Sequence, residues 1–192
     1  FANAQTGNIV LMSQAAFNGD LSRVLHYLIP LLSFALGVAA AEVIHIRYRE
    51  AKHLHWRQLV LVVEILLLFG VGFIPNTLDL AANALVSFAC AMQVQAFRKV
   101  HGYPFASTMC IGNMRSGMES LVVYFHLHDK KVLHKALHYF GVILLFAIGA
   151  GVGAHCVAVF GNKTIWFSCA LLLVSLCFMF IQDEEEDLKE KA

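Results

Sequence analysis

The sequence predicts an all-α fold, a polytopic helical membrane bundle built from two internal repeats. Three observations predict it: a membrane-like composition, five apolar stretches close to the length of a spanning helix, and a segment that recurs 112 residues later. Of the 192 residues, 59% are hydrophobic and 14% are charged, and the mean hydropathy is +0.68, far from the values of soluble globular domains. The formal net charge of +1 gives no electrostatic reason to expect a nucleic-acid partner.

The apolar stretches predict the individual helices. A helix needs about 20 apolar residues to cross the hydrocarbon core of a bilayer. Two shorter or interrupted stretches, 4–17 and 107–125, each contain a Gly-Asn pair, and they are predicted to be half-helices rather than ordinary spans. The five candidate spans are 27–45, 59–74, 81–97, 136–160 and 165–181.

An internal repeat relates the two halves of the chain. The segment "HYLIPLLSFALG" at 26–37 matches "HYFGVILLFAIG" at 138–149 in six of twelve positions, including a polar His-Tyr pair. Repeats of this kind are common in transporters and should be sought first in a membrane protein. We therefore assign a single membrane domain to 1–182, with repeat one at 1–80 and repeat two at 81–182, followed by an acidic cytoplasmic tail at 183–192.

The Gly-Asn pair also occurs once in each repeat. Gly7 and Asn8 correspond to Gly112 and Asn113. In the second repeat a full helix, 81–97, precedes this pair, so the equivalent first helix of repeat one is expected upstream of residue 1.

Loop charges predict the orientation, because Lys and Arg concentrate on the cytoplasmic side. The loop 47–57 carries four such residues, whereas 75–80 carries none and is expected outside. If 107–125 enters the membrane and returns, Lys130 and Lys131 are also cytoplasmic, and each repeat has three spans plus a half-helix. The repeats are then inverted, a recurrent transporter architecture. If 107–125 crosses fully, the chain has eight spans and parallel repeats.

Three stretches carry a family resemblance: "FANAQTGNIVLMS", "SFALG", and "ALVSFACAMQVQAFRKVHG" with the following "FASTMCIGN". Together they resemble the YoaK-like family of small bacterial integral membrane proteins, whose function is uncharacterised. The family's first-half T-G-N is present here as Thr6, Gly7 and Asn8. Of its second-half pattern, G-x-Q-N followed by T-G, this chain keeps Gln93 and Gly112 and differs at the flanking positions. The resemblance implies about six membrane helices and a multi-pass location in the bacterial inner membrane, and it implies no substrate.

The two Gly-Asn pairs suggest a site. A glycine lets the backbone leave helical geometry, and an adjacent Asn can cap the helix that resumes. Such a break is tolerated in a membrane only where it is buried or lines a polar cavity, and a helix start offers a partial positive charge to an anion or a carbonyl oxygen. We expect 6–8 and 111–113 to approach each other around a solute, with Gln93 and Arg115 close by. Alternatively, the glycines only let helices pack closely.

Three charged residues lie well inside apolar stretches, away from their ends. Glu64 is near the middle of its stretch, where a lone carboxylate is costly, so we expect it to face the bundle interior with a polar neighbour within hydrogen-bonding reach. It is either functional or a protonated or hydrogen-bonded structural carboxyl. Arg115 and Glu119 are four residues apart on a helix, which favours an ion pair. In the alternative, Arg115 is a fixed charge that favours an anionic or carbonyl-bearing solute.

No motif indicates an enzyme. Hydrolase, metalloprotease and nucleotide-binding signatures are lacking in the sequence, and no catalytic residue or cofactor is predicted. No metal site is predicted either, because the His-x-His pairs at 53–55 and 126–128 lie in basic loops without enough partner ligands. The five cysteines form no CxxC pair and are interpreted as small core hydrophobes.

The sequence therefore predicts a small-solute transporter or channel, whose partners are the lipid bilayer and an unknown, anionic or carbonyl-bearing solute. The alternative is a non-transporting membrane scaffold or partner subunit. The candidate substrate-binding residues are Thr6, Gly7, Asn8, Glu64, Gln93, Gly112, Asn113, Arg115 and Glu119.

The repeat makes a structural prediction. Residues 26–74 and 138–181 should superpose about a pseudo-twofold axis that lies in the membrane plane, because each half carries an odd number of spans. An experimental structure in lipid would measure the direction of this axis. An axis along the membrane normal would contradict the inverted arrangement.

Overall fold

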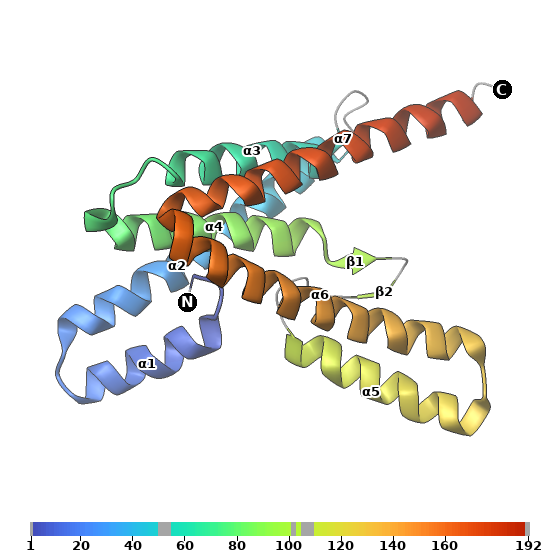
Figure 1. The fold of residues 1–192 in the computed structure, drawn as a ribbon, viewed down its shortest axis with the longest axis horizontal. Coiled ribbons are helices and arrows are strands. Elements are labelled where there is room, and N and C mark those ends of the chain that lie inside the picture. Colours follow the sequence, from blue (N-terminus) through green and yellow to red (C-terminus); the bar gives the residue numbers. More distant parts are fainter. Residues whose placement is uncertain (1, 50–54, 101–102, 105–109, 191–192) are drawn as a thin grey trace. The chain divides into compact units, whose positions relative to one another are not determined.

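A computed structural model describes residues 2–49, 55–100, 103–104 and 110–190. The chain forms two compact units, the first made of Phe1–Ala96 with Phe160–Ala192 and the second of Phe97–Val159. The described residues are almost entirely helical (Figure 1). The exception is a short antiparallel hairpin of β1 (Lys99–Val100) and β2 (Tyr103–Pro104) in the second unit.

The first unit is a stack of packed helices. The α2 helix packs against α1 and α4, α4 packs against α3, and α3 packs against α7 (Figure 1). Two 3-10 turns, η1 (Asn76–Leu78) and η2 (Gly161–Thr164), precede α4 and α7. The α-helices are α1 (Gln5–Phe17), α2 (Leu21–Tyr48), α3 (Trp56–Val71), α4 (Asp79–Ala96) and α7 (Ile165–Glu190).

Local capping separates α1 from α2. Gly19 adopts a φ of +73°, the left-handed conformation that favours glycine after a helix end, and the backbone N–H of Asp20 donates to the Ala15 carbonyl at 3.0 Å. Asp20 then caps α2, since its carboxylate accepts from the backbone N–H of Arg23 at 3.1 Å. These bonds form a tight turn that returns the chain along α1.

The contact between α2 and α4 brings two backbones together. A Cβ on Gly37 would overlap the Phe88 carbonyl oxygen and would lie 2.8 Å from the Ala91 Cβ. Ala41 and Ala91 are fully buried in the same unit. Small residues at i and i+4 let helices approach closely, which is the packing that the small-xxx-small spacing indicates.

The α3 and α7 helices meet through aromatic residues. The indole Nε1 of Trp166 donates to the Phe69 carbonyl at 3.2 Å, and its ring stacks on Phe69 with centroids 6.0 Å apart. A Cβ on Gly72 would overlap this indole. Below the ring, Leu68, Ala89 and Cys169 form a buried apolar cluster.

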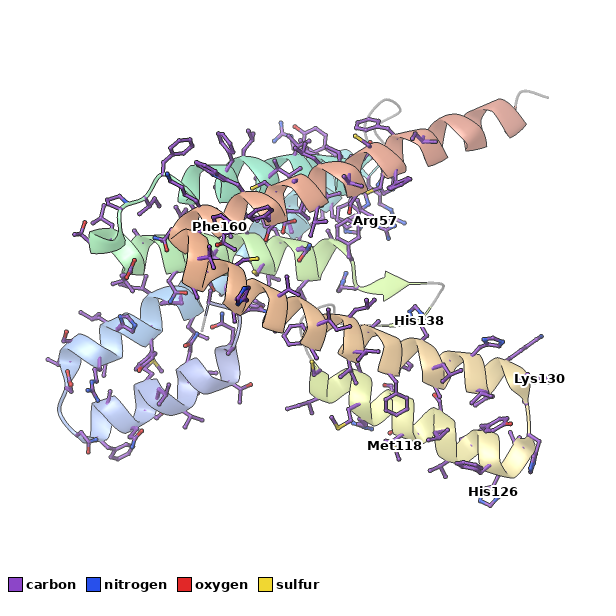
Figure 2. The ribbon with its side chains drawn as sticks, in the orientation of Figure 1. Arg57, Met118, His126, Lys130, His138 and Phe160 are labelled. Carbon is purple, nitrogen blue, oxygen red and sulfur yellow. The ribbon has the colours of Figure 1, made fainter. Side chains whose placement is uncertain are left out.

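The second unit contains α5 (Cys110–Leu127) and most of α6 (Lys130–Phe160). Gly117 of α5 faces α6, because a Cβ there would lie 3.2 Å from the Phe140 ring and 3.3 Å from the Tyr139 Cβ. Figure 2 marks Met118 and His126 on α5 and Lys130 and His138 on α6. His126 and Lys130 lie where a short turn joins the two helices.

The helices agree with the apolar stretches. The five candidate spans and the described residues of both shorter stretches lie mainly in α-helices, and residues 107–109 lie outside the described part of the chain. The described residues contain two helical stretches that are long and apolar enough to cross a membrane, Leu21–Tyr48 and Lys130–Ile181. The unit boundaries differ from the repeat boundary at 80/81, because α4 packs against α2 and α3 and α7 packs against α3. The helix α7 also continues into the predicted tail, as far as Glu190.

The α2–α4 contact predicts the effect of one added methyl group. Gly37→Ala should lower the free energy of unfolding by about 1–3 kcal/mol, because the new Cβ collides with backbone that must shift. Thermal or denaturant unfolding of the purified protein in detergent would measure it. The matched control is Gly70→Ala on α3, where a Cβ meets nothing within 4 Å. Equal stability of both variants would contradict the close contact.

Candidate functional site

The first Gly-Asn pair lies inside a helix. The α1 helix begins at Gln5, so Thr6, Gly7 and Asn8 belong to its first turn and the backbone is not broken at Gly7. The N-cap residue is Ala4, and no side chain caps it, so the prediction that Asn8 caps a resuming helix is wrong. The Asn8 backbone N–H already donates to the Ala4 carbonyl at 3.0 Å, and its side chain points inward. Thr6 is exposed.

Asn8 belongs to a chain of hydrogen bonds across three helices. Its Nδ2 donates to Gln5 Oε1 at 3.1 Å, and Gln5 Nε2 donates to Ser87 Oγ at 3.0 Å. The Ser87 hydroxyl donates in turn to the Pro30 carbonyl at 2.7 Å. Asn8 and Ser87 are 1% and 0% exposed. We call these four groups, from α1, α4 and α2, the Asn8–Pro30 polar chain.

Helix geometry places this polar chain about a third of the way along α2. Pro30 lies nine residues after Leu21, the start of α2, a rise of about 14 Å. The hydrocarbon core of a bilayer is about 30 Å thick. The α1 helix has 13 residues, a length of about 20 Å, so it is too short to cross such a core. It begins at the level of Pro30 and runs back along α2.

A groove follows the same face of α1. It has a volume of about 340 Å³ and lies between α1 and the start of α2. One helical face, by its spacing, carries positions 8, 11 and 15 of α1 and position 18 at its C-terminal cap. The last three of these line the groove. The groove therefore leads from the α1–α2 turn toward the side of α1 that carries Asn8. Its lining residues are Leu11, Gln14, Ala15, Asn18, Asp20, Arg23 and Tyr27.

The second Gly-Asn pair has the same helical register. Gly112 and Asn113 are the third and fourth residues of α5, as Gly7 and Asn8 are of α1. Asn113 is also buried, with 3% exposed, whereas Gly112 is exposed. The two pairs belong to different compact units, so their approach to each other stays a prediction.

Arg115 and Glu119 form the predicted ion pair. Arg115 Nε lies 2.9 Å from Glu119 Oε1, and both side chains are well exposed, 80% and 61%. Such an exposed i,i+4 pair is screened by water and contributes little to helix stability. The ion pair that the spacing of four residues favours is therefore confirmed.

Gln93 is half-buried, and no hydrogen bond of its side chain occurs in the described part of the chain. Its neighbour Gln95 makes the interhelical contact instead, donating through Nε2 to the Glu42 carboxylate of α2. Glu42 also lies 3.4 Å from His45 Nδ1. Gln95 is one of the neutral residues of the sequence that could join helices, but its partner Glu42 lies near a helix end, where a Glu is ordinarily solvated.

Glu64 lies in the interior of the first unit. It is the ninth of the 16 residues of α3 and is 2% exposed, which confirms the predicted inward position. The predicted hydrogen-bonding neighbour is not found among the described residues, since Oε2 is fully enclosed and lacks a partner. The thiols of Cys90 on α4 and Cys169 on α7 lie within electrostatic reach.

The described residues define an all-helical class of protein, with polar side chains buried between apolar helices. Two of its helical stretches are long and apolar enough to span a membrane. The chain belongs to the family described as "Protein of unknown function (DUF1275)", whose model matches residues 1–178. No curated protein and no solved structure matches it.

The polar chain predicts the effect of removing one hydroxyl group. Ser87→Ala should destabilise the protein by about 1–3 kcal/mol, because the Pro30 carbonyl and the Gln5 amide then lose a buried partner. Equilibrium unfolding in detergent would measure the change. Ser175→Ala is the matched control, since that hydroxyl bonds only within its own exposed helix turn, to the Leu171 carbonyl at 3.1 Å. A loss of stability no larger than in the control would show that the polar chain is absent.

Proposed function

We propose that this protein is a multi-pass small-solute transporter or channel of the bacterial inner membrane, and that it is a YoaK-like protein. The observation that carries the proposal is the Asn8–Pro30 polar chain, which joins three helices of the first unit at the start of a 13-residue helix. Transporters use such short or broken helices, whose starts near the midplane face the substrate.

The chemistry of the polar chain suits a solute that accepts hydrogen bonds. The first amides of α1 and the Nδ2 group of Asn8 are donors, and a helix start carries a partial positive charge. A carboxylate, another small anion or a carbonyl oxygen would be stabilised there. The groove beside α1 provides a route toward this position from the α1–α2 turn.

In the proposed architecture the second repeat completes the site. Asn113 occupies the same register and is buried in the same way, so the inverted repeats would bring a second helix start to the solute. Gln93 would line the same cavity. Arg115 would contribute a positive charge only by leaving Glu119, its partner at 2.9 Å.

One observation favours the alternative, a scaffold or partner subunit without transport. Gly37 and Gly117 both lie at close helix contacts, against Phe88 and Phe140, whereas a Cβ on Gly112 of the second Gly-Asn pair would meet nothing within 4 Å. In that alternative the hydrogen bonds of Asn8, Gln5 and Ser87 only join helices.

Flux measurements distinguish the two functions. The full chain in vesicles should carry at least one labelled anion from a panel of chloride, phosphate, sulfate, acetate and succinate. Asn8→Ala and Asn113→Leu should each abolish this flux while the protein stays folded and inserted, because each removes a buried amide from the site. Ser175→Ala, on an exposed face of α7, is the control and should transport normally. Wild-type flux in both Asn variants would contradict the site, and no flux of any anion would favour the scaffold.

A further inference from the structure

A second buried polar group lies apart from the polar chain, in the middle of α3. The Glu64 carboxyl is 2% exposed, and its Oε2 is enclosed without a hydrogen-bond partner in the described part of the chain. Glu64 lies eight residues after Trp56 and seven before Val71, about 12 Å and about 10 Å from the two helix ends. Water at either end of the helix is therefore distant.

The surroundings of Glu64 are apolar. Val60, Leu61 and Leu68 lie one helical turn away on the same face of α3, and all are at most 5% exposed. From α4 and α7 the nearby titratable groups are the thiols of Cys90 and Cys169, and the Cys169 thiol donates to the Ile65 carbonyl at 3.9 Å.

The other helix that packs against α3 offers no cation to Glu64. Glu42 and His45 of α2 contact each other at 3.4 Å, and the His45 ring lies 4.4 Å from the ring of Trp56, at the beginning of α3. Trp56 is two helical turns from Glu64. None of the ion pairs of the described residues includes Glu64.

The apolar surroundings of Glu64 favour a proton over a metal cation as its ligand. An ionised carboxylate without a partner costs several kcal/mol in such a place, and a bound proton removes the charge. A hard metal cation would need several oxygen ligands, whereas one carboxyl and two thiols are present. Among the described residues, no group of three or more His, Cys, Asp or Glu side chains is placed so that it could hold a metal ion. A proton is the cation that one carboxyl binds without further ligands.

We propose that Glu64 is a proton-binding site inside the bundle, and that its protonation couples solute movement to the proton gradient. One O–H bond forms on the carboxylate when a proton enters from water, and the same bond breaks when the proton leaves; no electrons are transferred. The coupling rests on the proposed transport function, but the proton site does not.

The α4 helix connects this carboxyl with the polar chain. Cys90, within reach of Glu64, is three residues from Ser87, which is one turn or about 4.5 Å along the same helix. A negative charge on Glu64 would favour an arrangement of α4 that admits water, and the protonated form favours the packed one. A ligand shifts an equilibrium between two states only if it binds one of them more tightly. A proton binds a carboxyl buried among apolar groups much more tightly than one in contact with water.

Chemical modification tests the proton site directly. Dicyclohexylcarbodiimide, an apolar reagent, modifies protonated carboxyls, and mass spectrometry of the full chain in detergent would locate it. Glu64 should be modified at acidic pH and progressively protected as the pH rises. Glu42 and Glu119, which bond to Gln95 and Arg115, should stay unmodified. The modification at position 64 should be lost in Glu64→Gln and kept in Glu64→Asp, with all variants checked for folding by size-exclusion chromatography.

Three results would overturn the proton site: no modification of Glu64, modification that is equal at acidic and alkaline pH, or protection by sodium ions at constant pH. The last result would identify a sodium site.

Anion flux under an imposed pH gradient tests the coupling, using the anion that moves fastest in the panel. Wild-type vesicles should accumulate it in response to the gradient, and Glu64→Gln should lose that response. A response retained by Glu64→Gln would overturn the coupling. If no anion moves in wild-type vesicles but Glu64 is modified with the expected pH dependence, the transport function fails and the proton site stands.

Discussion

The close contact of α2 with α4 is the constraint on which the rest of the first unit depends. Gly37 lets the α2 backbone touch the Phe88 carbonyl, and this contact places Ser87, one residue before, at the Pro30 carbonyl. Ser87 then holds Gln5 and thereby the start of α1. A side chain at position 37 would separate the helices, and the hydroxyl would no longer reach α2. The polar chain is therefore a consequence of small-residue packing.

The helices were predictable from the sequence, whereas the polar contacts between them were not. Hydropathy predicts seven helical stretches, because a local run of apolar residues marks each of them in the sequence. Ser87 stands in "LVSFACAM", where a serine is indistinguishable from any other small residue of an apolar helix. Its role depends on Pro30, 57 residues away, and no local spacing shows such a pairing. For the same reason the sequence does not distinguish Gln5 from other neutral polar residues.

For Glu64 the sequence predicted the position of the side chain but not its neighbours. The cost of burying a charge predicts an inward position and a partner, and only the position is found. The expectation of a partner followed from the cost of leaving a carboxyl unpaired among apolar groups, and the neighbours that the fold supplies are aliphatic side chains and two thiols. A neutral carboxyl is compatible with such neighbours. The missing partner is therefore the observation from which we infer a proton site at Glu64.

The two Gly-Asn pairs share a register but not a chemical environment, and this difference bears on how a common site could work. The residue three before Asn8 is Gln5, which links α1 to α4, whereas the residue three before Asn113 is Cys110, a much weaker hydrogen-bonding group.

On α5 the inward face is formed by Asn113, Gly117 and Ser120, and Gly117 packs against Tyr139 and Phe140. The Ser120 hydroxyl bonds back to its own helix, at the Ser116 carbonyl. The start of α1 is thus held to other helices by hydrogen bonds through Gln5 and Ser87, and α5 has no amide side chain at the position that matches Gln5. In a pair of inverted repeats the two helix starts would therefore face a common solute with different neighbouring side chains.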